Sequence, residues 1–347
     1  MTAARARRPF PRSGRERRHD DWPPTRLHWS AVPVLLRPAI LLASLLWLSG
    51  CAPHWLVRDT RTAALDLAGR APDVVILGVS GRCSPPCVAP RDNWDYLSSR
   101  GTLDAVADVY AAAGYRVEVA GFASHPAASH TSPYLPRPQS GYEALVAAVS
   151  RMRATWLRSG MPPRVVLVAH SHGVAWAHLL TRTFPEVAFT AQVDLDGMCV
   201  AWRSDYGAAV RALPPAAPDE PQLLDACDAV SITGRTVPLK DVVWPNVALN
   251  LEVQSKRLPA RTSASGGLPV NYLFELARNT RLDGTATGIQ HFLSVREDHS
   301  AISYPNSDAL AWVTARLRDQ MQAWPAPPAP AGSAQPASTV DPPAQEP

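Results

Sequence analysis

Continuous apolar runs alternate with segments of helical periodicity between residues 73 and 322. The apolar runs predict strands, and the segments in which apolar residues recur every three or four positions predict helices. The expected strands are 73–81, 116–122, 165–169, 187–197, 246–255 and 287–295, and the expected helices are 101–115, 142–160, 174–184 and 307–322. Buried strands separated by helices are typical of a parallel sheet. We therefore expect an α/β fold with a mostly parallel central sheet flanked by helices.

Two stretches interrupt this alternation. Residues 198 to about 243 form a long, irregular connection that contains prolines, which predicts a lid-like insertion. Trp202 and Trp244 lie near its two ends, where they either line an acyl pocket or pack the insertion itself. Eight of the 23 residues from Pro325 onward are proline. Because such a composition builds no packed core, residues 324–347 are expected to be a disordered tail.

The first 50 residues differ from the rest in charge and hydropathy. They hold nine arginines against three acidic residues, a net charge of +6, whereas the whole chain carries +4. The remainder is therefore mildly acidic, which gives no reason to expect a nucleic-acid partner. Residues 38–48 follow the basic stretch as an apolar run that is short for a membrane span.

This apolar run ends in Leu48-Ser49-Gly50-Cys51, which resembles a bacterial lipobox. The resemblance implies that residues 1–50 are a signal peptide and that cleavage leaves a lipid on Cys51, with residues 51–71 as the lipidated N-terminus and linker. The alternative is a signal anchor with an incidental cysteine. Ala52 is not the aspartate associated with inner-membrane retention. We therefore expect an exported protein, lipid-anchored to the cell envelope and, in a Gram-negative bacterium, to the outer membrane.

Four cysteines remain besides Cys51, and an even number permits disulfides in an exported chain. Of the three possible pairings we favour the local one, Cys83 with Cys87 and Cys199 with Cys227. A zinc site is the less favoured alternative, because the spacing lacks paired C-x-x-C clusters. No two histidines at helical ligand spacing enclose a glutamate, so we expect neither a metal nor a cofactor.

The stretch VVLVAHSHGV, residues 165–174, places a serine where an apolar strand turns into a helix. Ala169 and Gly173, two positions before and after Ser171, are small, although glycine is usual at the first of these positions. Small residues here allow a sharp turn that holds the serine in a strained conformation with its hydroxyl exposed. Ser171 is therefore the candidate nucleophile.

His299 is the candidate general base. It follows the last expected strand and precedes the final helix, and none of the other nine histidines has this place in the chain. A loop at the carboxyl end of a terminal strand brings an imidazole over a serine on a central strand. There the imidazole takes the hydroxyl proton and later returns it to the leaving group.

The order of strand, serine turn, helix and late histidine resembles the α/β-hydrolase superfamily over residues 72–323. This resemblance implies a lipase-like or esterase-like serine hydrolase with an oxyanion hole of two backbone amides. One amide belongs to the residue after the nucleophile, here His172. The second is expected after the first strand, at Val79 or Ser80.

The acid of the triad has three candidates. Most α/β hydrolases place it after the strand that corresponds to residues 246–254, but no aspartate stands there. A branch that resembles pancreatic lipases places it one strand earlier, and there Asp196 ends the strand. We expect Asp196 to be the acid. Asp283, in a loop before the last strand, and Glu252 are the alternatives.

Together these features predict a lipid-anchored envelope serine hydrolase that cleaves carboxylic esters by acylation and deacylation of Ser171. The substrate would be a small-molecule or lipid ester, and lipase, esterase and thioesterase activities all fit. An acyltransferase or a peptidase would use the same residues. A non-catalytic envelope lipoprotein that uses the hydrolase scaffold for binding is the alternative from another class. The missing aspartate after residues 246–254 favours this alternative.

Overall fold

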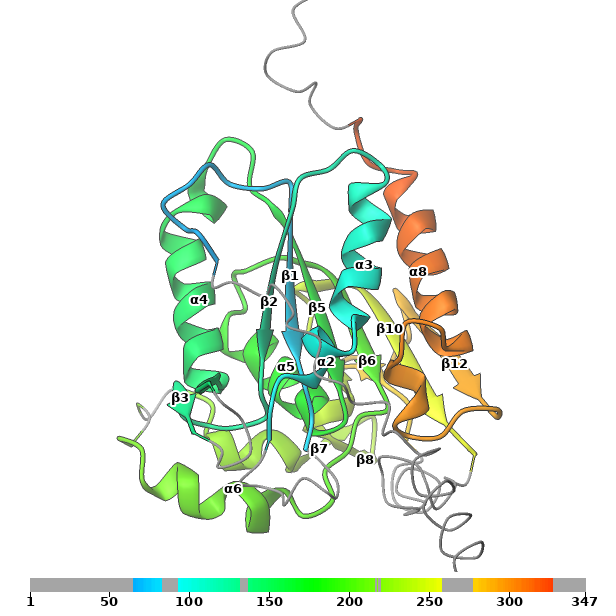
Figure 1. Ribbon diagram of the computed structural model, residues 1–347. Coiled ribbons are helices and arrows are strands. Elements are labelled where there is room, and N and C mark those ends of the chain that lie inside the picture. The colour runs from blue at the N-terminus through cyan, green and yellow to red at the C-terminus, as the bar shows by residue number, and fades with distance from the viewer. Residues whose placement is uncertain are drawn as a thin grey trace, which may run out of the picture. The chain divides into compact units, whose positions relative to one another are not determined.

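Six parallel strands form the central sheet of the protein (Figure 1). The computed structural model describes residues 65–82, 93–131, 137–215, 217, 220–257 and 277–326, all within the unit Trp55–Pro347. The strands are β1 (Val74–Val79), β2 (Val117–Phe122), β5 (Arg164–His170), β6 (Phe189–Leu195), β10 (Val247–Ser255) and β12 (Ile289–Ser294). Their spatial order is β12-β10-β6-β5-β1-β2. The predicted parallel sheet is therefore confirmed.

The chain changes its direction of travel across the sheet between β1 and β5. It first runs from β1 outward to β2, and then returns to the other side of β1 and adds β5, β6, β10 and β12 in turn. In open parallel sheets, ligands bind outside the carboxyl ends of the strands at such a switch point. The carboxyl ends of β1 and β5 are thus the place where a site is expected.

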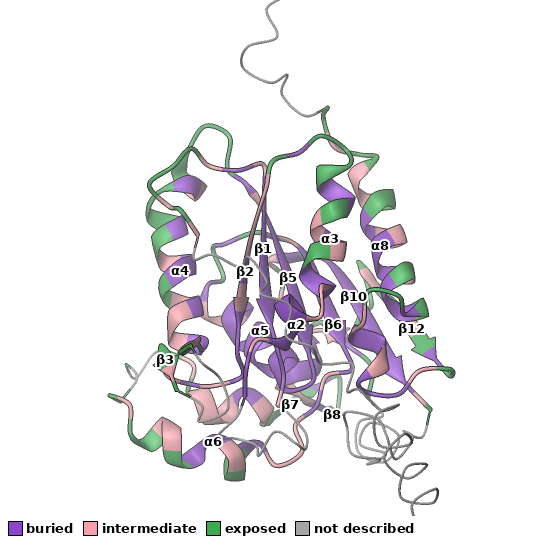
Figure 2. Cartoon of the chain, in the orientation of Figure 1, coloured by how far each residue is buried: buried purple, intermediate pink, exposed green. Residues whose placement is uncertain are grey.

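Helices cover both faces of the sheet. One face packs against α3 (Thr102–Ala111) and α8 (Asp308–Met321), and the other against α4 (Tyr142–Ala154) and α5 (His172–Thr183). Alternate residues of β1 enter the two cores, so that every residue of this strand is buried (Figure 2). This parallel sheet, with helices on both faces and a sharp turn from β5 into α5, is an α/β-hydrolase fold.

Several helix ends differ from the sequence prediction. The helix expected over 101–115 ends at Ala111, and that expected over 142–160 ends at Ala154, followed by a 3-10 turn at Trp156–Arg158. The short helix α2 (Tyr96–Ser99) was not predicted. Its N-cap, Asp95, accepts a hydrogen bond from the Ser98 amide. The short strands β3 (Ser129–His130), β4 (Gln139–Ser140) and β11 (Thr280–Arg281) were also not predicted.

The insertion over 198–243 is more regular than expected. Its elements are α6 (Trp202–Arg211), the hairpin of β7 (Ala229–Ile232) and β8 (Arg235–Pro238), the short strand β9 (Val242–Val243), and two 3-10 turns, Leu223–Cys227 and Leu239–Asp241. Trp202 is buried against Trp176, with ring centroids 4.5 Å apart. Trp244 packs against the apolar side chains of the β7–β8 hairpin. Both tryptophans therefore pack the insertion.

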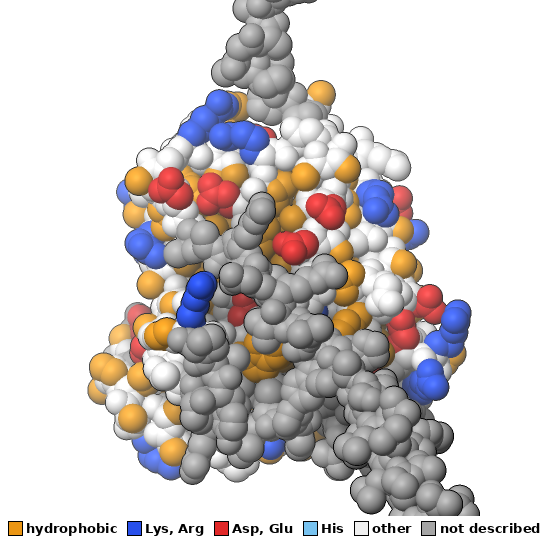
Figure 3. All heavy atoms as spheres, viewed as in Figure 1, with side chains coloured by type: hydrophobic (Ala, Val, Ile, Leu, Met, Phe, Trp, Pro, Cys, Tyr) orange, Lys and Arg blue, Asp and Glu red, His pale blue; other side chains and the backbone are white. Residues whose placement is uncertain are grey.

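Some predictions fall on residues outside the described ranges. The signal peptide and Cys51 lie outside them, as do Cys83, Cys87 and residues 327–347 of the expected tail. Trp324, at the start of that tail, is packed instead, because its ring stacks on Tyr110 with centroids 5.5 Å apart. In the part of the chain that the structure describes, no helix is long and apolar enough to span a membrane. Figure 3 shows basic and acidic side chains interspersed over one face.

Candidate active site

Ser171 lies in the sharp turn between β5 and α5, at the carboxyl edge of the sheet. Its backbone adopts φ 59° and ψ −130°, which is strained for a residue with a Cβ. The Ser171 amide donates to the Leu195 carbonyl at 3.0 Å. A Cβ added to Gly173 would lie 2.0 Å from the Val79 carbonyl oxygen, so only glycine fits where α5 begins against β1. The close approach of helix and strand therefore explains the small residue two positions after the serine.

His299 connects Ser171 to Asp196. Its Nε2 atom lies 3.0 Å from Ser171 Oγ, and its Nδ1 atom lies 2.7 Å from Asp196 Oδ2. Because an ionised carboxylate only accepts hydrogen bonds, Nδ1 carries the proton and Nε2 of the neutral ring is left to accept one from the serine. All three side chains are buried, with Ser171 2% exposed. The structure thus brings together the three residues that the sequence analysis selected.

Asp196 is the residue that follows β6. Its φ of 54° lies in the left-handed region, which aspartate tolerates better than most residues. Its amide donates to the Val253 carbonyl at 2.8 Å. Two further donors come from Ser255, at the end of β10, whose amide lies 2.7 Å from Oδ1 and whose hydroxyl lies 2.6 Å from Oδ2. The strand end that lacks the usual aspartate therefore supplies hydrogen bonds to a carboxylate on the neighbouring strand.

The two alternative acids have other partners. Asp283 is exposed in a turn, where its carboxylate accepts the Thr285 amide at 2.9 Å. Glu252 is buried on β10 and accepts hydrogen bonds from the Asn279 amide at 3.0 Å and from Gln254 at 2.8 Å. Of the three candidate acids, Asp196 is the one whose carboxylate contacts His299 among the described residues.

The backbone amides expected to form an oxyanion hole belong to His172 and to Val79 or Ser80. His172 begins α5, so its amide has no partner within the helix and lies at the positive end of the helix dipole. Val79 belongs to the ladder of β1, where it pairs with Phe122 and Ala169. The Ser80 amide is engaged as well, because it donates to the Phe122 carbonyl at 2.8 Å. The structure therefore does not support Ser80 as the second donor, because its amide already has a partner on β2.

Two histidines flank Ser171, and both are buried. Burial lowers the pKa of His172 to about 3 and lowers that of His170 well below its usual value. His172 Nε2 lies 2.7 Å from the Val200 carbonyl, and its Nδ1 lies 3.0 Å from Tyr206 Oη. Both imidazoles are therefore neutral and hydrogen-bonded within the fold, whereas the His299 imidazole contacts the Ser171 hydroxyl.

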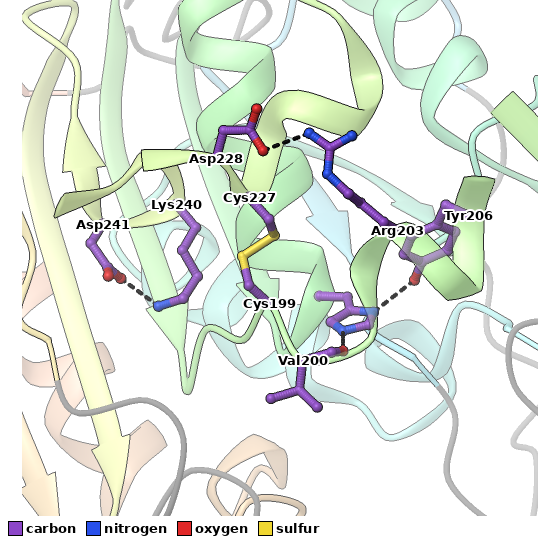
Figure 4. The surroundings of a disulfide bond; sticks show 9 residues. Cys199, Val200, Arg203, Tyr206, Cys227, Asp228, Lys240 and Asp241 are labelled. Atoms are coloured by element: carbon purple, nitrogen blue, oxygen red, sulfur yellow. Dashed lines mark hydrogen bonds and ion pairs between the residues drawn. A yellow bond between two sulfur atoms is a disulfide. The ribbon is translucent and has the colours of Figure 1, made fainter. Parts of the chain in front are cut away.

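The start of the insertion covers Ser171. The Sδ atom of Met198 lies 3.6 Å from Ser171 Oγ, and the next residue, Cys199, forms a disulfide with Cys227 (Figure 4). This bond, which the sequence analysis favoured, joins the segment before α6 to the turn that precedes β7. An ion pair between Arg203 and Asp228 at 2.6 Å bridges the same two segments. The residue over the nucleophile is thus held next to a covalent cross-link.

A second polar cluster lies on β6 and β10, beside the triad. Asp194 accepts hydrogen bonds from His178 at 2.9 Å, Asn250 at 2.6 Å and Asn279 at 2.8 Å. Burial by itself lowers the pKa of His178, but the Asp194 carboxylate more than offsets this, and the net pKa is raised. The cluster therefore holds a buried ion pair. Within the described residues, no group of three His, Cys, Asp or Glu side chains is placed to hold a metal ion.

Comparisons with known proteins give distant structural matches. No family model and no curated protein matches the sequence. A hormone-sensitive lipase from a metagenome library is 15% identical, with 82% of this chain and 98% of that chain covered and a TM-score of 0.40. The esterase domain of a Rhodothermus marinus protein is 18% identical, with 73% of this chain and 88% of that chain covered and a TM-score of 0.34. The strand order and side-chain geometry of this chain, rather than these distant likenesses, define its fold and its site.

Proposed function

We propose that the protein is a serine hydrolase that cleaves carboxylic esters through an acyl-enzyme on Ser171. The observation that carries this proposal is the pair of contacts made by His299, 3.0 Å to the Ser171 hydroxyl and 2.7 Å to the Asp196 carboxylate. A base within hydrogen-bond reach of a hydroxyl, and oriented by a third group, is the arrangement that activates a weak nucleophile. A scaffold used only for binding has no need of this alignment in a strained turn.

The reaction follows from the positions of these atoms. Ser171 Oγ attacks the ester carbonyl carbon, its proton passes to His299 Nε2, and the carbonyl oxygen becomes an oxyanion. Asp196 stabilises the imidazolium that forms, and the His172 amide donates to the oxyanion. The carbon–oxygen bond to the alcohol then breaks as His299 returns the proton to the leaving oxygen. A water molecule then attacks the carbonyl carbon of the acyl-enzyme as His299 takes its proton. His299 returns that proton to Ser171 Oγ, and the carboxylic acid leaves.

A fluorophosphonate probe tests the nucleophile. Its phosphorus bonds to the oxygen of an activated serine as fluoride leaves, so the wild type should gain the mass of the probe less HF and Ser171→Ala should not. Ser204→Ala is the matched control, because Ser204 is an exposed serine on α6 whose hydroxyl donates to the Ala201 carbonyl. Labelling that persists in Ser171→Ala, or a wild type that is not labelled, contradicts the proposal. The second result favours the non-catalytic alternative.

The substrate class is tested with p-nitrophenyl esters of graded acyl length. An esterase prefers short chains and a lipase prefers long ones, whereas an acyltransferase forms a new ester when an alcohol acceptor is added and a peptidase cleaves amides. Since Met198 lies against the nucleophile, we expect the acyl chain to enter only after this side chain moves. The expected result is hydrolysis of the ester series with release of free acid.

We further propose that the mature protein is exported and anchored to the cell envelope by a lipid on Cys51. Support comes from the sequence Leu48-Ser49-Gly50-Cys51 after a short apolar run. Intact-mass measurement should find an N-terminus at Cys51 that carries added acyl mass, and Cys51→Ser should abolish that mass. An unmodified chain that retains residues 1–50 would contradict the anchor without bearing on the hydrolase proposal.

A further inference from the structure

Tyr96 and His170 form a continuous hydrogen-bonded line that ends on the backbone of the base. Tyr96 Oη lies 2.5 Å from His170 Nδ1, and His170 Nε2 lies 2.7 Å from the His299 carbonyl oxygen. At the other end, the Gly81 amide donates to Tyr96 Oη at 2.7 Å. Tyr96 and His170 are 2% and 3% exposed. Their polar atoms therefore depend on one another rather than on solvent.

The donors in this line are fixed by its two ends. An amide only donates and a carbonyl only accepts, so Gly81 donates to the Tyr96 oxygen and the His299 carbonyl accepts from His170 Nε2. The Tyr96 hydroxyl must then donate to His170 Nδ1, because Nε2 of the neutral ring carries the proton. With its hydrogen directed at His170, Tyr96 is not a donor for an oxyanion. His170 is held as one tautomer of one charge state.

Both ends of the line adjoin the reacting atoms. A Cβ placed on Gly81 would lie 2.3 Å from the Cβ of Ser171, so this backbone runs directly against the nucleophile. At the other end, the His170 ring lies 4.7 Å from the His299 ring, centroid to centroid, as well as donating to its carbonyl. The line thus spans from the backbone beside the serine to the backbone of the base.

Residues that follow Tyr96 in the chain also bind the loop that follows His299. Arg100 lies over the Tyr96 ring, 4.2 Å from its centroid, and donates to Ser303 Oγ at 2.5 Å. Thr102 donates to the Ser303 carbonyl at 2.5 Å. Since Ser303 is four residues after His299, α2 and the start of α3 fix this loop at two places. Tyr96 is connected to the His299 end of this loop by the hydrogen bonds of His170.

We propose that Tyr96 and His170 are positioning residues that hold His299 in line with Ser171. This inference rests on the proposed function, because it assigns the line a role in catalysis. The His299 side chain must meet Ser171 Oγ and Asp196 together, and a loop free to shift by about 1 Å would lose that alignment. The line acts on the backbone of the base, so it affects rate rather than substrate binding.

Three substitutions test the proposal. Tyr96→Phe removes the hydroxyl, and His170→Leu removes the donor to the His299 carbonyl. We expect each to lower kcat about 10- to 100-fold while KM changes less than about twofold, because a lost hydrogen bond leaves a buried group unpaired. His170→Gln keeps an N–H group near the position of Nε2 and should restore kcat to within about threefold of wild type. Tyr110→Phe is the matched control, since the Tyr110 hydroxyl is buried and has no hydrogen-bond partner within the described residues.

A readout that does not depend on turnover is the downfield proton NMR signal of the His299 Nδ1–H group. Asp196→Asn assigns it, because that variant loses the carboxylate acceptor. We expect the signal to shift or broaden in Tyr96→Phe and His170→Leu, and to stay in place in His170→Gln and Tyr110→Phe. Wild-type values of kcat and of this signal in Tyr96→Phe would overturn the proposal. So would a folded His170→Gln as slow as His170→Leu.

The substitutions at Tyr96 and His170 still test the proposal if one of these variants fails to fold. Circular dichroism identifies such a variant, and the other two then decide the question. Failure of the proposed function has a different signature, because wild-type Ser171 would then not react with the fluorophosphonate probe. The NMR comparison still reports in that case whether Tyr96 and His170 position His299.

Discussion

Ser255 donates both its amide and its hydroxyl to the carboxylate of Asp196, at 2.7 Å and 2.6 Å. The two residues lie at the carboxyl ends of neighbouring strands, β10 and β6. Two hydrogen bonds to one carboxylate fix its orientation. Ser255 therefore orients the carboxylate that contacts His299, and it lies at the strand end where the family resemblance led us to look for the acid first.

Ser255→Ala should lower kcat/KM about tenfold, because a hydrogen bond to a charged group is worth about 1.5–3 kcal/mol and part of that is retained by the amide. The measurement is steady-state hydrolysis of a p-nitrophenyl ester across a pH series. Ser159→Ala serves as the control, because it removes the hydroxyl of an exposed serine that follows the 3-10 turn Trp156–Arg158 and donates to the Trp156 carbonyl. A Ser255→Ala variant with wild-type kinetics would show that the amide alone holds Asp196.

Asp196→Asn tests the choice of acid. The amide nitrogen of asparagine cannot accept the Nδ1 proton, so the imidazole loses its orientation and the charge that stabilises the imidazolium. We expect kcat to fall about 10⁴-fold with little change in the fold, as for the same change in other serine triads. Asp283→Asn removes an exposed carboxylate and should leave kcat unchanged. The reverse result would transfer the role to Asp283.

The sequence was informative where the signal is local. The turn at Ser171 is encoded by a strand, small residues and a helix that are adjacent in the chain, and His299 follows from its place between the last strand and the last helix. Asp196 was selected because it ends a predicted strand and because the branch of the α/β hydrolases that resembles pancreatic lipases carries its acid at the end of that strand. In each case a short stretch of residues and a simple topology determine the position.

Other contacts depend on partners far along the chain. Asp194 binds Asn279, 85 residues away, and nothing near either residue predicts the pair. Tyr96 lies in a helix too short for periodicity to reveal, and its partner His170 was considered only as a neighbour of the nucleophile. The Ser80 amide was proposed for the oxyanion hole from the family resemblance, but its partner, the Phe122 carbonyl, belongs to a strand 42 residues further along the chain.

Glu252 gives the folded protein a predictable pH dependence. Burial, helped by the nearby carboxylates of Asp241 and Asp194, raises its pKa from 4.5 to about 7. A raised carboxyl pKa means that the folded state binds more protons than the unfolded state between these values. The contribution of Glu252 protonation to the free energy of unfolding is therefore fully present below pH 4.5 and is lost as pH rises through about 7.

Glu252→Gln, which mimics the protonated form, should remove this dependence. The free energy of unfolding of the wild type minus that of the variant should fall by about 3 kcal/mol between pH 4 and pH 8. Urea unfolding at intervals of half a pH unit measures this difference, and contributions from other groups cancel in it. Asp283→Asn is the control at an exposed site. A difference that stays constant with pH would contradict the buried, protonated state of Glu252.

The Cys199–Cys227 disulfide links stability to access at Ser171. The bond closes a loop between residues 28 apart in sequence. Replacing both cysteines with serine should therefore lower the free energy of unfolding by about 3.6 kcal/mol, the loss expected for a loop of this length. The same change frees the segment that begins at Met198, whose side chain covers the serine hydroxyl. We therefore expect the double variant to unfold at a lower temperature and to react faster with a small fluorophosphonate probe.

Arg203→Gln is the matched control for this variant. It breaks the exposed ion pairs to Asp225 and Asp228, which bridge the same two segments as the disulfide, and exposed pairs contribute little to stability. The control should keep the wild-type unfolding temperature and labelling rate. If the double cysteine variant is destabilised but labels Ser171 at the wild-type rate, the disulfide supports only the fold, and movement of Met198 does not limit access to the nucleophile.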